Sequence, residues 1–357
     1  MEATLHYLRY ILATLFVLGV VIVVHEFGHA LVAKRLGMVV KEFSVGFGPR
    51  VLGWNWKGTR VVVRLVPLGG FVRIVGLEPE EWADPEGFYS KPLSSRAAVL
   101  TAGGALNLAC AFALFTLVIW AKGVPEGGSR VVATVIWGSP AHRAGLREGD
   151  EIVGVNGRFY KDIGKIVEVI ERSPGRKVVL LVRRGGRVME VAVWPEPRWK
   201  HEVVGGSIRA RRVGMIGVVF KLRSRRVGLW RAMAISAGNI GRIFLAFKFF
   251  FEGLKRLFRP ESVVGGPITI VKEAGMQAQL GFSNLVLLAA AMSAFIGILN
   301  LLPFPALDGG RLLFVILAAL RVRVHPLVEG RFHLVGFALL LILIVLLTAQ
   351  DIWRLGQ

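Results

Sequence analysis

Three residues near the start of the chain have the types and spacing of a catalytic zinc site. His25 and His29 are four positions apart, so on a helix they share one face and both imidazoles can bind the same metal ion. Glu26 lies between them, beside the open coordination position, where it can take a proton from water and later return it to a leaving amine. A catalytic zinc site takes three protein ligands and a water, so the third ligand must come from elsewhere.

The surroundings of this motif favour catalysis over a passive role. The motif closes an uncharged stretch that runs through residues 10–24, and an ionisable residue inside a membrane segment indicates function by default. The alternative is a helix end whose polar groups simply reach headgroups and water. That alternative explains His29 well, but it explains Glu26 poorly, because apolar residues flank Glu26 on both sides.

A candidate for the third ligand lies in the segment NLLPFPALDGGR, residues 300–311. Asp308 follows an uncharged run in which Pro303 and Pro305 break the helix and free backbone groups, and such backbone is tolerated in a membrane only against protein or a wet cavity. A carboxylate there can bind a metal ion. Asn300 can hydrogen-bond a peptide carbonyl or the oxyanion that develops from it. The alternative is a simple helix kink, with Asp308 as the cap of the next helix.

The elements that must hold these residues are membrane helices. Of the 357 residues 54% are hydrophobic and only 19% charged, too apolar a composition for an ordinary soluble enzyme. We expect four transmembrane segments, within residues 1–33, 96–121, 283–320 and 332–352. A signal peptide in place of the first is disfavoured, because no small-residue cleavage site follows it. The net charge of +21 fits anionic lipid beside the chain, and without a nucleic-acid motif we expect no nucleic-acid partner.

Residues 227–258 are apolar overall but carry several charges, each of which costs about 2.5–3.5 kcal/mol at mid-bilayer. We therefore expect an amphipathic helix on the membrane surface. Topology gives a second reason, because four spans place the histidine motif and Asp308 on the same side of the membrane and a fifth would separate them. Lys34 and Arg35, just after the first span, predict that this side is the cytosol.

Two β-rich regions lie between the spans. Residues 34–95 predict a membrane-associated β-hairpin on the cytosolic side, since runs such as RVVVRLV are β-branched and end in turn signals. Residues 127–200 alternate short β-rich runs with turns and would lie on the outer side. Within them, GSPAHRAGLREGDEIVGVNG resembles a PDZ domain of the bacterial protease type, whose groove binds an extended peptide as an added strand. The alternative is a β-module without a ligand.

Taken together, these motifs resemble the site-2 protease family of intramembrane zinc metalloproteases, in particular the bacterial regulator-of-sigma-E protease type. HEFGH matches the family's first motif, NLLPFPALDGGR its second, and RLVPLGGFVRI its membrane-associated hairpin. The resemblance implies zinc bound by His25, His29 and Asp308. It also implies Glu26 as the general base and Asn300 in substrate binding.

Two departures from the family pattern stand out. We find one PDZ domain where better-known members of this branch carry two, which puts in doubt any role that needs the pair. The second span usually carries Ala-Gly-Pro-x-x-Asn in this family, whereas this chain has Gly104 in the proline position and keeps Asn107.

We therefore expect a polytopic α-helical membrane protein with four transmembrane helices, a membrane-associated β-hairpin and one inserted PDZ domain, in a bacterial inner membrane. It would cleave single-span membrane proteins of the anti-sigma factor type, which dock as a strand at the hairpin edge near Val61, Val63 and Leu65. Peptide C-termini or ectodomain stubs would bind the PDZ groove. The alternatives are a non-catalytic PDZ membrane adaptor with a vestigial metal site, and a metal-ion transporter.

Overall fold

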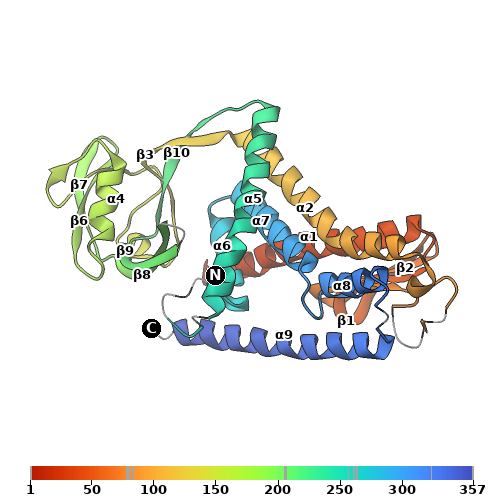
Figure 1. Ribbon diagram of the computed structural model, residues 1–357. Helices are drawn as coiled ribbons and strands as arrows, with labels where there is room; N and C mark the ends of the chain where they lie inside the picture. Colours follow the sequence, from red (N-terminus) through yellow and green to blue (C-terminus); the bar gives the residue numbers. More distant parts are fainter. Residues whose placement is uncertain are drawn as a thin grey trace.

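The chain forms a group of helices with a β domain on one side and a β-hairpin on the other (Figure 1). The computed structural model describes residues 2–77, 81–82, 84–204, 207–255, 257–259, 262, 264–322 and 324–355. The helices of the bundle are α1 (Glu2–Arg35), α2 (Leu93–Lys122), α5 (Leu229–Leu254), α6 (Pro267–Gln279), α7 (Phe282–Leu301), α8 (Asp308–Ala319) and α9 (Pro326–Leu355).

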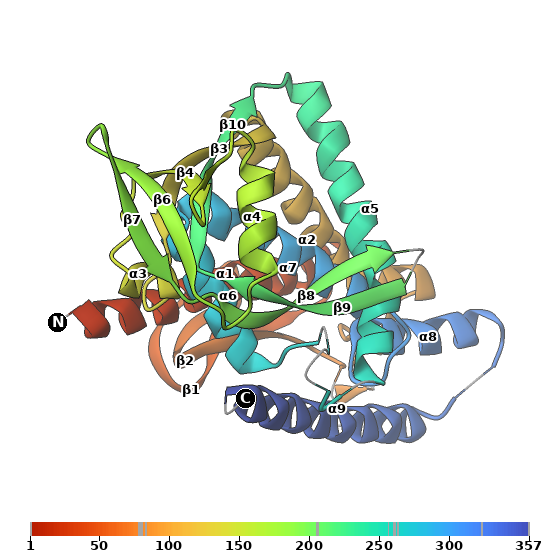
Figure 2. The same ribbon diagram turned by 90° about the vertical axis from the view of Figure 1, so that its left-hand side faces the viewer.

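Among the described residues, five helices are long and apolar enough to cross a membrane: α1, α2, α5, α7 and α9. The chain is therefore a multi-pass membrane protein. The additional candidate beyond the four expected segments is α5, which lies in the segment expected on the membrane surface. In both Figure 1 and Figure 2, α5 runs crosswise to α9. The segment expected as one span over residues 283–320 consists of two helices, because α7 ends at Leu301, just before the two prolines.

Helix α2 is the centre of the bundle and packs against α1, α5, α7 and α8. Its contact with α7 is close because two glycines face each other there: a Cβ at Gly104 would lie 2.9 Å from the carbonyl oxygen of Gly297. The hydroxyl of Ser293 donates a hydrogen bond of 2.9 Å to the backbone oxygen of Asn107, which fixes the two helices in register. This arrangement leaves one face of α2 against the HEFGH end of α1.

The hairpin strands β1 (Val40–Trp56) and β2 (Thr59–Ile74) pair antiparallel and also bend back on themselves. As a result, residues 42–45 lie between residues 60–63 on one side and residues 70–73 on the other. Gly46 permits the bend in β1, since its φ is +90° and a Cβ there would lie 2.7 Å from the carbonyl oxygen of Val66. The edge segments of this sheet are therefore residues 50–56 and 70–73.

The β domain is a sheet of strand order β10-β3-β4-β6-β7, with β5 beside β4 and a separate hairpin β8-β9. Its core contains fully buried aliphatic residues such as Ile152, Ile166 and Leu180. The strands are β3 (Val124–Val135), β4 (Glu151–Val155), β5 (Arg158–Phe159), β6 (Val178–Arg184), β7 (Arg187–Val193), β8 (Glu196–Val204), β9 (Ser207–Met215) and β10 (Val218–Arg225); the helices are α3 (Pro140–Arg143) and α4 (Ile163–Glu171).

The boundaries of this domain differ from the expected residues 127–200. Its last strand, β10, pairs with its first, β3, so the domain closes only at Arg225. The same two strands lead to α2 and α5 and join the domain to the bundle (Figure 1). Inside the domain, Asp150 is buried and accepts two hydrogen bonds of 2.7 Å from the Arg184 guanidinium, which lowers the pKa of the Asp150 carboxyl.

Candidate metal centre

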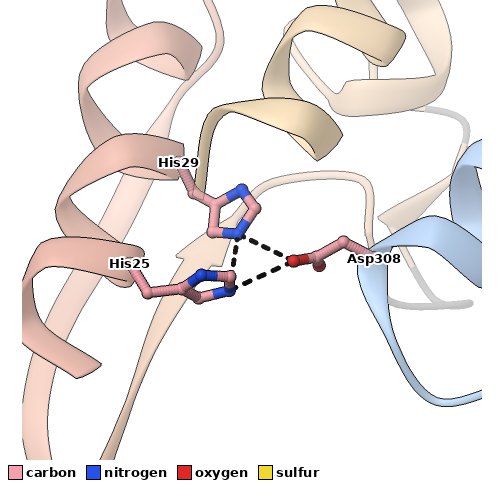
Figure 3. Close-up of side chains that lie close together, drawn as sticks. All are labelled: His25, His29 and Asp308. Atoms are coloured by element: carbon pink, nitrogen blue, oxygen red, sulfur yellow. Dashed lines mark hydrogen bonds and ion pairs between the residues drawn. The ribbon is translucent and has the colours of Figure 1, made fainter. Parts of the chain in front are cut away.

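Side chains from two distant parts of the chain meet at the HEFGH end of α1 (Figure 3). The Nε2 atoms of His25 and His29 are 3.2 Å apart, and each lies 3.1 Å from Oδ2 of Asp308 at the start of α8. The side chains are largely shielded, with exposed fractions of 12% for His25, 10% for His29 and 23% for Asp308. The helix and the proline-broken segment thus bring the three expected ligands together.

The spacing and chemistry of this set fit zinc. Ligand atoms about 2.0–2.1 Å from a tetrahedral zinc ion stand roughly 3.3 Å from one another, which is close to the separations between these three atoms. The hydrogen bonding also fits, because Nδ1 of His29 is 2.8 Å from the carbonyl oxygen of Val99. A carbonyl only accepts, so Nδ1 carries the proton and Nε2 presents a lone pair. Two imidazole nitrogens and a carboxylate oxygen at these distances form a suitable cage for a cation.

Helix α2 also contacts the other histidine, His25. The side-chain amide of Asn107 is fully buried, and its Nδ2 lies 3.4 Å from Nδ1 of His25. Its Oδ1 is also buried, without a hydrogen-bond partner in the described part of the chain. Rotating the amide by 180° places Oδ1 beside Nδ1 of His25, where it accepts a hydrogen bond from the Nδ1–H group and leaves Nε2 free for the metal. In this orientation Asn107 accepts a hydrogen bond from Nδ1 of His25, as the Val99 carbonyl does from Nδ1 of His29.

The close approach of α2 to the two histidines depends on Gly103. A Cβ at this position would lie 2.3 Å from Nε2 of His29 and 2.7 Å from Cε1 of His25. Any larger residue would therefore occupy the space of the ligand atoms themselves. Val99, Gly103 and Asn107 lie about one turn apart along the helix, so a single face of α2 forms one wall of the centre.

Asp308 is held by the chain that precedes it. After α7 the chain forms a tight loop in which Ala306 adopts a positive φ of 70°, an uncommon conformation for a residue with a side chain. The backbone N–H of Ala306 donates a hydrogen bond of 3.0 Å to Nδ1 of His333 in α9. Helix α9 therefore helps to fix the loop that delivers Asp308 to the histidines.

Glu26 and Asn300 line the same cavity as the ligands. This cavity has a volume of about 410 Å³, and Glu26 and Asn300 share its wall with His25 and Asp308. The carboxylate of Glu26 accepts a hydrogen bond from the backbone N–H of Val72 in the hairpin. Other lining residues come from α1, the hairpin, α7 and the Asp308 loop: Val21, Ile22, Phe47, Gly69, Gly70, Ile296, Ala306 and Leu307. A carboxylate base and an amide donor thus lie beside the three ligands.

The three hairpin residues expected to bind substrate lie elsewhere. Val61 pairs with Phe43 on one side and with Trp54 on the other, and Val63 is likewise paired on both sides, so neither has a free edge for an added strand. Leu65 is 64% exposed, and none of the three lines the cavity at the metal centre. The prediction placed these residues at an edge of the hairpin, whereas the bend of both strands places residues 59–64 inside the sheet.

Sequence reasoning assigned no role to four residues that shape this centre: Val99, Gly103, Asn107 and His333. For Asn107 a signal was present, because a buried amide in an uncharged span needs a partner. The contact of Val99 is made by a backbone atom and leaves no trace in the residue type. Gly103 and His333 become informative only once their neighbours in space are known.

Comparison with known proteins agrees with this geometry. The family model described as peptidase family M50 matches residues 13–343 of the chain. The zinc metalloprotease RasP of Oceanobacillus iheyensis is 28% identical, over 97% of this chain and 99% of its own length. RasP of Geobacillus kaustophilus is also 28% identical, over 97% of this chain and 98% of its own. A chain of Rhizobium meliloti, named as a candidate zinc metalloprotease, is 32% identical with both chains covered in full.

Proposed function

This chain belongs to peptidase family M50 and is an intramembrane zinc metalloprotease, and from that premise we propose that it cleaves single-span membrane proteins of the anti-sigma factor type. The proposal rests on one cavity. Glu26 lines it together with two of the metal ligands, His25 and Asp308, and the hairpin contributes Gly69 and Gly70. A non-catalytic adaptor does not require a general base beside the metal, and a transporter does not require a strand edge beside it. A protease requires the base to activate water and can use the strand edge to bind its substrate.

The chemistry follows from the positions of the side chains. Zinc held by the two histidines and Asp308 would polarise the scissile carbonyl and lower the pKa of water toward ~7. Glu26 takes a proton from the attacking water and returns it to the leaving amine. Asn300, on the same cavity wall, donates a hydrogen bond to the carbonyl oxygen as negative charge develops there.

A substrate helix must unwind before it is cut, because its carbonyl groups are hydrogen-bonded within the helix. The strand edge at residues 70–73 offers the substrate backbone alternative hydrogen-bond partners. One side of this segment pairs with residues 42–45, and on its other side the backbone N–H of Val72 donates a hydrogen bond to Glu26. Gly69 and Gly70, where this edge begins, line the cavity. We infer that the substrate adds as a strand here rather than near Val61 to Leu65.

We propose four spans, α1, α2, α7 and α9, in a bacterial inner membrane, with α5 as an amphipathic membrane-surface helix. Support comes from the charges of α5, which include Arg231, Arg242 and Lys248, and from its crosswise course in the figures. The metal centre then faces the cytosol, where Lys34 and Arg35 follow the first span. The β domain, joined to the far end of α2, lies on the outer side.

The β domain is proposed to act as a PDZ domain that receives peptide C-termini or ectodomain stubs. The support is the motif GSPAHRAGLREGDEIVGVNG, whose residues form α3 and β4 and the loop between them. A groove for an extended peptide beside α4 would select substrates already shortened outside the membrane.

Disulfide cross-linking tests strand addition directly. The full chain carries Glu26→Gln to trap substrate, Cys110→Ala to remove its only cysteine, and Phe47→Cys, whose position lines the cavity. Single cysteines are moved residue by residue along a single-span substrate. Cross-links at every second position are expected, because alternate residues of a strand point the same way. A repeat of three to four positions would instead mean that the substrate docks as a helix.

The control carries Val188→Cys on the exposed face of β7, far along the chain from the cavity. It is expected to give no periodic cross-links within the transmembrane part of the substrate. Cross-linking at Phe47→Cys no stronger than in this control would contradict docking at residues 70–73. Zinc content and chelator-sensitive cleavage are measured in parallel with Glu26 restored, so that failure of the docking model can be distinguished from failure of the enzyme.

A further inference from the structure

A second cavity lies on the side of α1 away from the metal centre, between this helix and the hairpin. Its volume is about 490 Å³. Its floor is apolar and includes Phe27 and Leu31 of α1 and Phe43 and Trp54 of the hairpin. Phe27 is 41% exposed and Trp54 53% exposed, so large apolar side chains border an open space. We call it the α1–hairpin cavity.

The mouth of the α1–hairpin cavity is positively charged. Lys34, Arg35 and Lys57 line it, and none of the described residues that line it is acidic. No ion pair with a carboxylate neutralises any of the three within the described chain. Three cations beside one apolar space repel each other and are complementary to an anion.

Two of these cations converge on one ring. The ammonium groups of Lys34 and Lys57 lie 5.4 and 5.7 Å from the ring centroid of Trp56. Lys34 also donates a hydrogen bond of 3.2 Å to the carbonyl oxygen of Lys57, which ties the end of α1 to the hairpin turn. The charges are therefore held at defined positions by the fold, and an anion between them would relieve their repulsion.

The position of this cavity matches a lipid boundary. Phe27, Leu31 and Lys34 lie on one face of α1, and Phe27 is two residues, or about 200°, from His25. The cavity is therefore separate from the metal centre. It lies where the apolar span of α1 passes into the basic residues Lys34 and Arg35 at its end. An apolar floor below a cationic mouth at such a boundary suits an acyl chain below an anionic headgroup.

We propose that the α1–hairpin cavity binds one anionic phospholipid molecule. Its phosphate lies against Lys34, Arg35 and Lys57, and an acyl chain lies along Phe27 and Leu31. A free phosphate would use the cations alone and leave the apolar floor uncovered. The inference rests on the membrane placement of the chain and not on its proposed substrate. Because Lys34 and the hairpin turn are joined at this site, the lipid holds the sheet against α1.

Lipid binding to the full-length protein tests this inference by native mass spectrometry from detergent, with phosphatidylglycerol, phosphatidylcholine or glycerol phosphate added at equal concentrations. The wild-type protein is expected to retain phosphatidylglycerol at least about tenfold more tightly than phosphatidylcholine. The double variant Lys34→Gln/Lys57→Gln is expected to lose about tenfold or more in that affinity, since each basic residue near an anionic headgroup is favourable.

The matched control, Arg158→Gln/Arg187→Gln, removes two exposed charges from the β domain and is expected to bind like wild type. A third variant, Leu31→Trp, fills the floor without changing charge and is expected to weaken binding as well. Equal binding of both lipids, equal affinities in the Lys34/Lys57 and control variants, or full competition by glycerol phosphate would each overturn the proposal. Unchanged zinc content shows that each variant is folded.

Discussion

Replacing Glu26 by Gln is expected to reduce cleavage of a single-span substrate by about 10²–10⁴-fold while zinc stays bound. The amide keeps the size of the side chain and its capacity to accept the hydrogen bond from Val72, but it can no longer take a proton from water. Because Glu26 lines the cavity and is not one of the three ligands, metal binding should be preserved. The measurement is the initial rate of cleavage of a purified substrate, with zinc content determined on the same samples.

The matched control for this variant is Glu252→Gln in α5, which removes a carboxylate outside the cavity and should leave the rate unchanged. Cleavage at the wild-type rate by Glu26→Gln would show that another group is the base. Loss of zinc together with activity would instead mean that Glu26 belongs to the ligand set.

Replacing Asn107 by Leu is expected to weaken zinc binding about 10–100-fold, the usual effect of removing a group that orients a metal-bound histidine. Leucine has as many side-chain heavy atoms as asparagine, with the same branching at Cγ, but it cannot accept a hydrogen bond from Nδ1 of His25, so the ring loses its fixed orientation and tautomer. Because the pocket around Asn107 is fully buried, water cannot easily replace the lost partner. The measurement is competition for zinc against a chelator of known affinity.

Asn107→Asp separates this positioning role from a merely structural one. A carboxylate accepts from Nδ1 as the amide oxygen does, so zinc affinity should return to within a few-fold of wild type although both variants alter the same buried site. If Leu and Asp weaken zinc binding equally, Asn107 matters for packing and not for His25. If Leu has no effect on zinc affinity, the proposed contact does not orient the ligand.

The grouping of the three side chains could be predicted from the sequence because it depends on residue type and spacing. Two histidines one helical turn apart can share an ion wherever the helix lies. The pairing of Asp308 with them required only that both motifs end on the same side of the membrane. The structure brings these residues together as that argument requires.

The hairpin could not be predicted to the same depth. Its strands are long enough to bend, and glycines such as Gly46 permit the bend, but their residue types do not say which segment becomes the edge. The expected docking site at Val61, Val63 and Leu65 assumed a free strand edge, whereas Val61 and Val63 are paired on both sides and the hairpin reaches the cavity through Gly69 and Gly70. The β domain was likewise predicted to end too early, since the pairing of β10 with β3 is a contact between distant residues.

The roles of α2 were not predicted because they depend on a close approach between helices. Nothing in the sequence places Val99, Gly103 and Asn107 beside the histidines, and one of the contacts is made by a backbone oxygen. Hydropathy also left α5 ambiguous, since its length and mean composition suit a span while its charges suit a surface. Such cases are decided by tertiary contacts that no local pattern encodes.

Metal analysis of the purified full-length protein with and without Asp308→Ala, alongside a cleavage assay, tests the central claim most directly. Asp162→Ala, which removes an exposed carboxylate from the β domain, is the control. The wild type and the control are expected to carry one zinc ion for each chain and to cleave, whereas Asp308→Ala should lose most of its zinc and its chelator-sensitive cleavage. Full zinc occupancy with wild-type cleavage in Asp308→Ala would show that this carboxylate does not share the ion with His25 and His29.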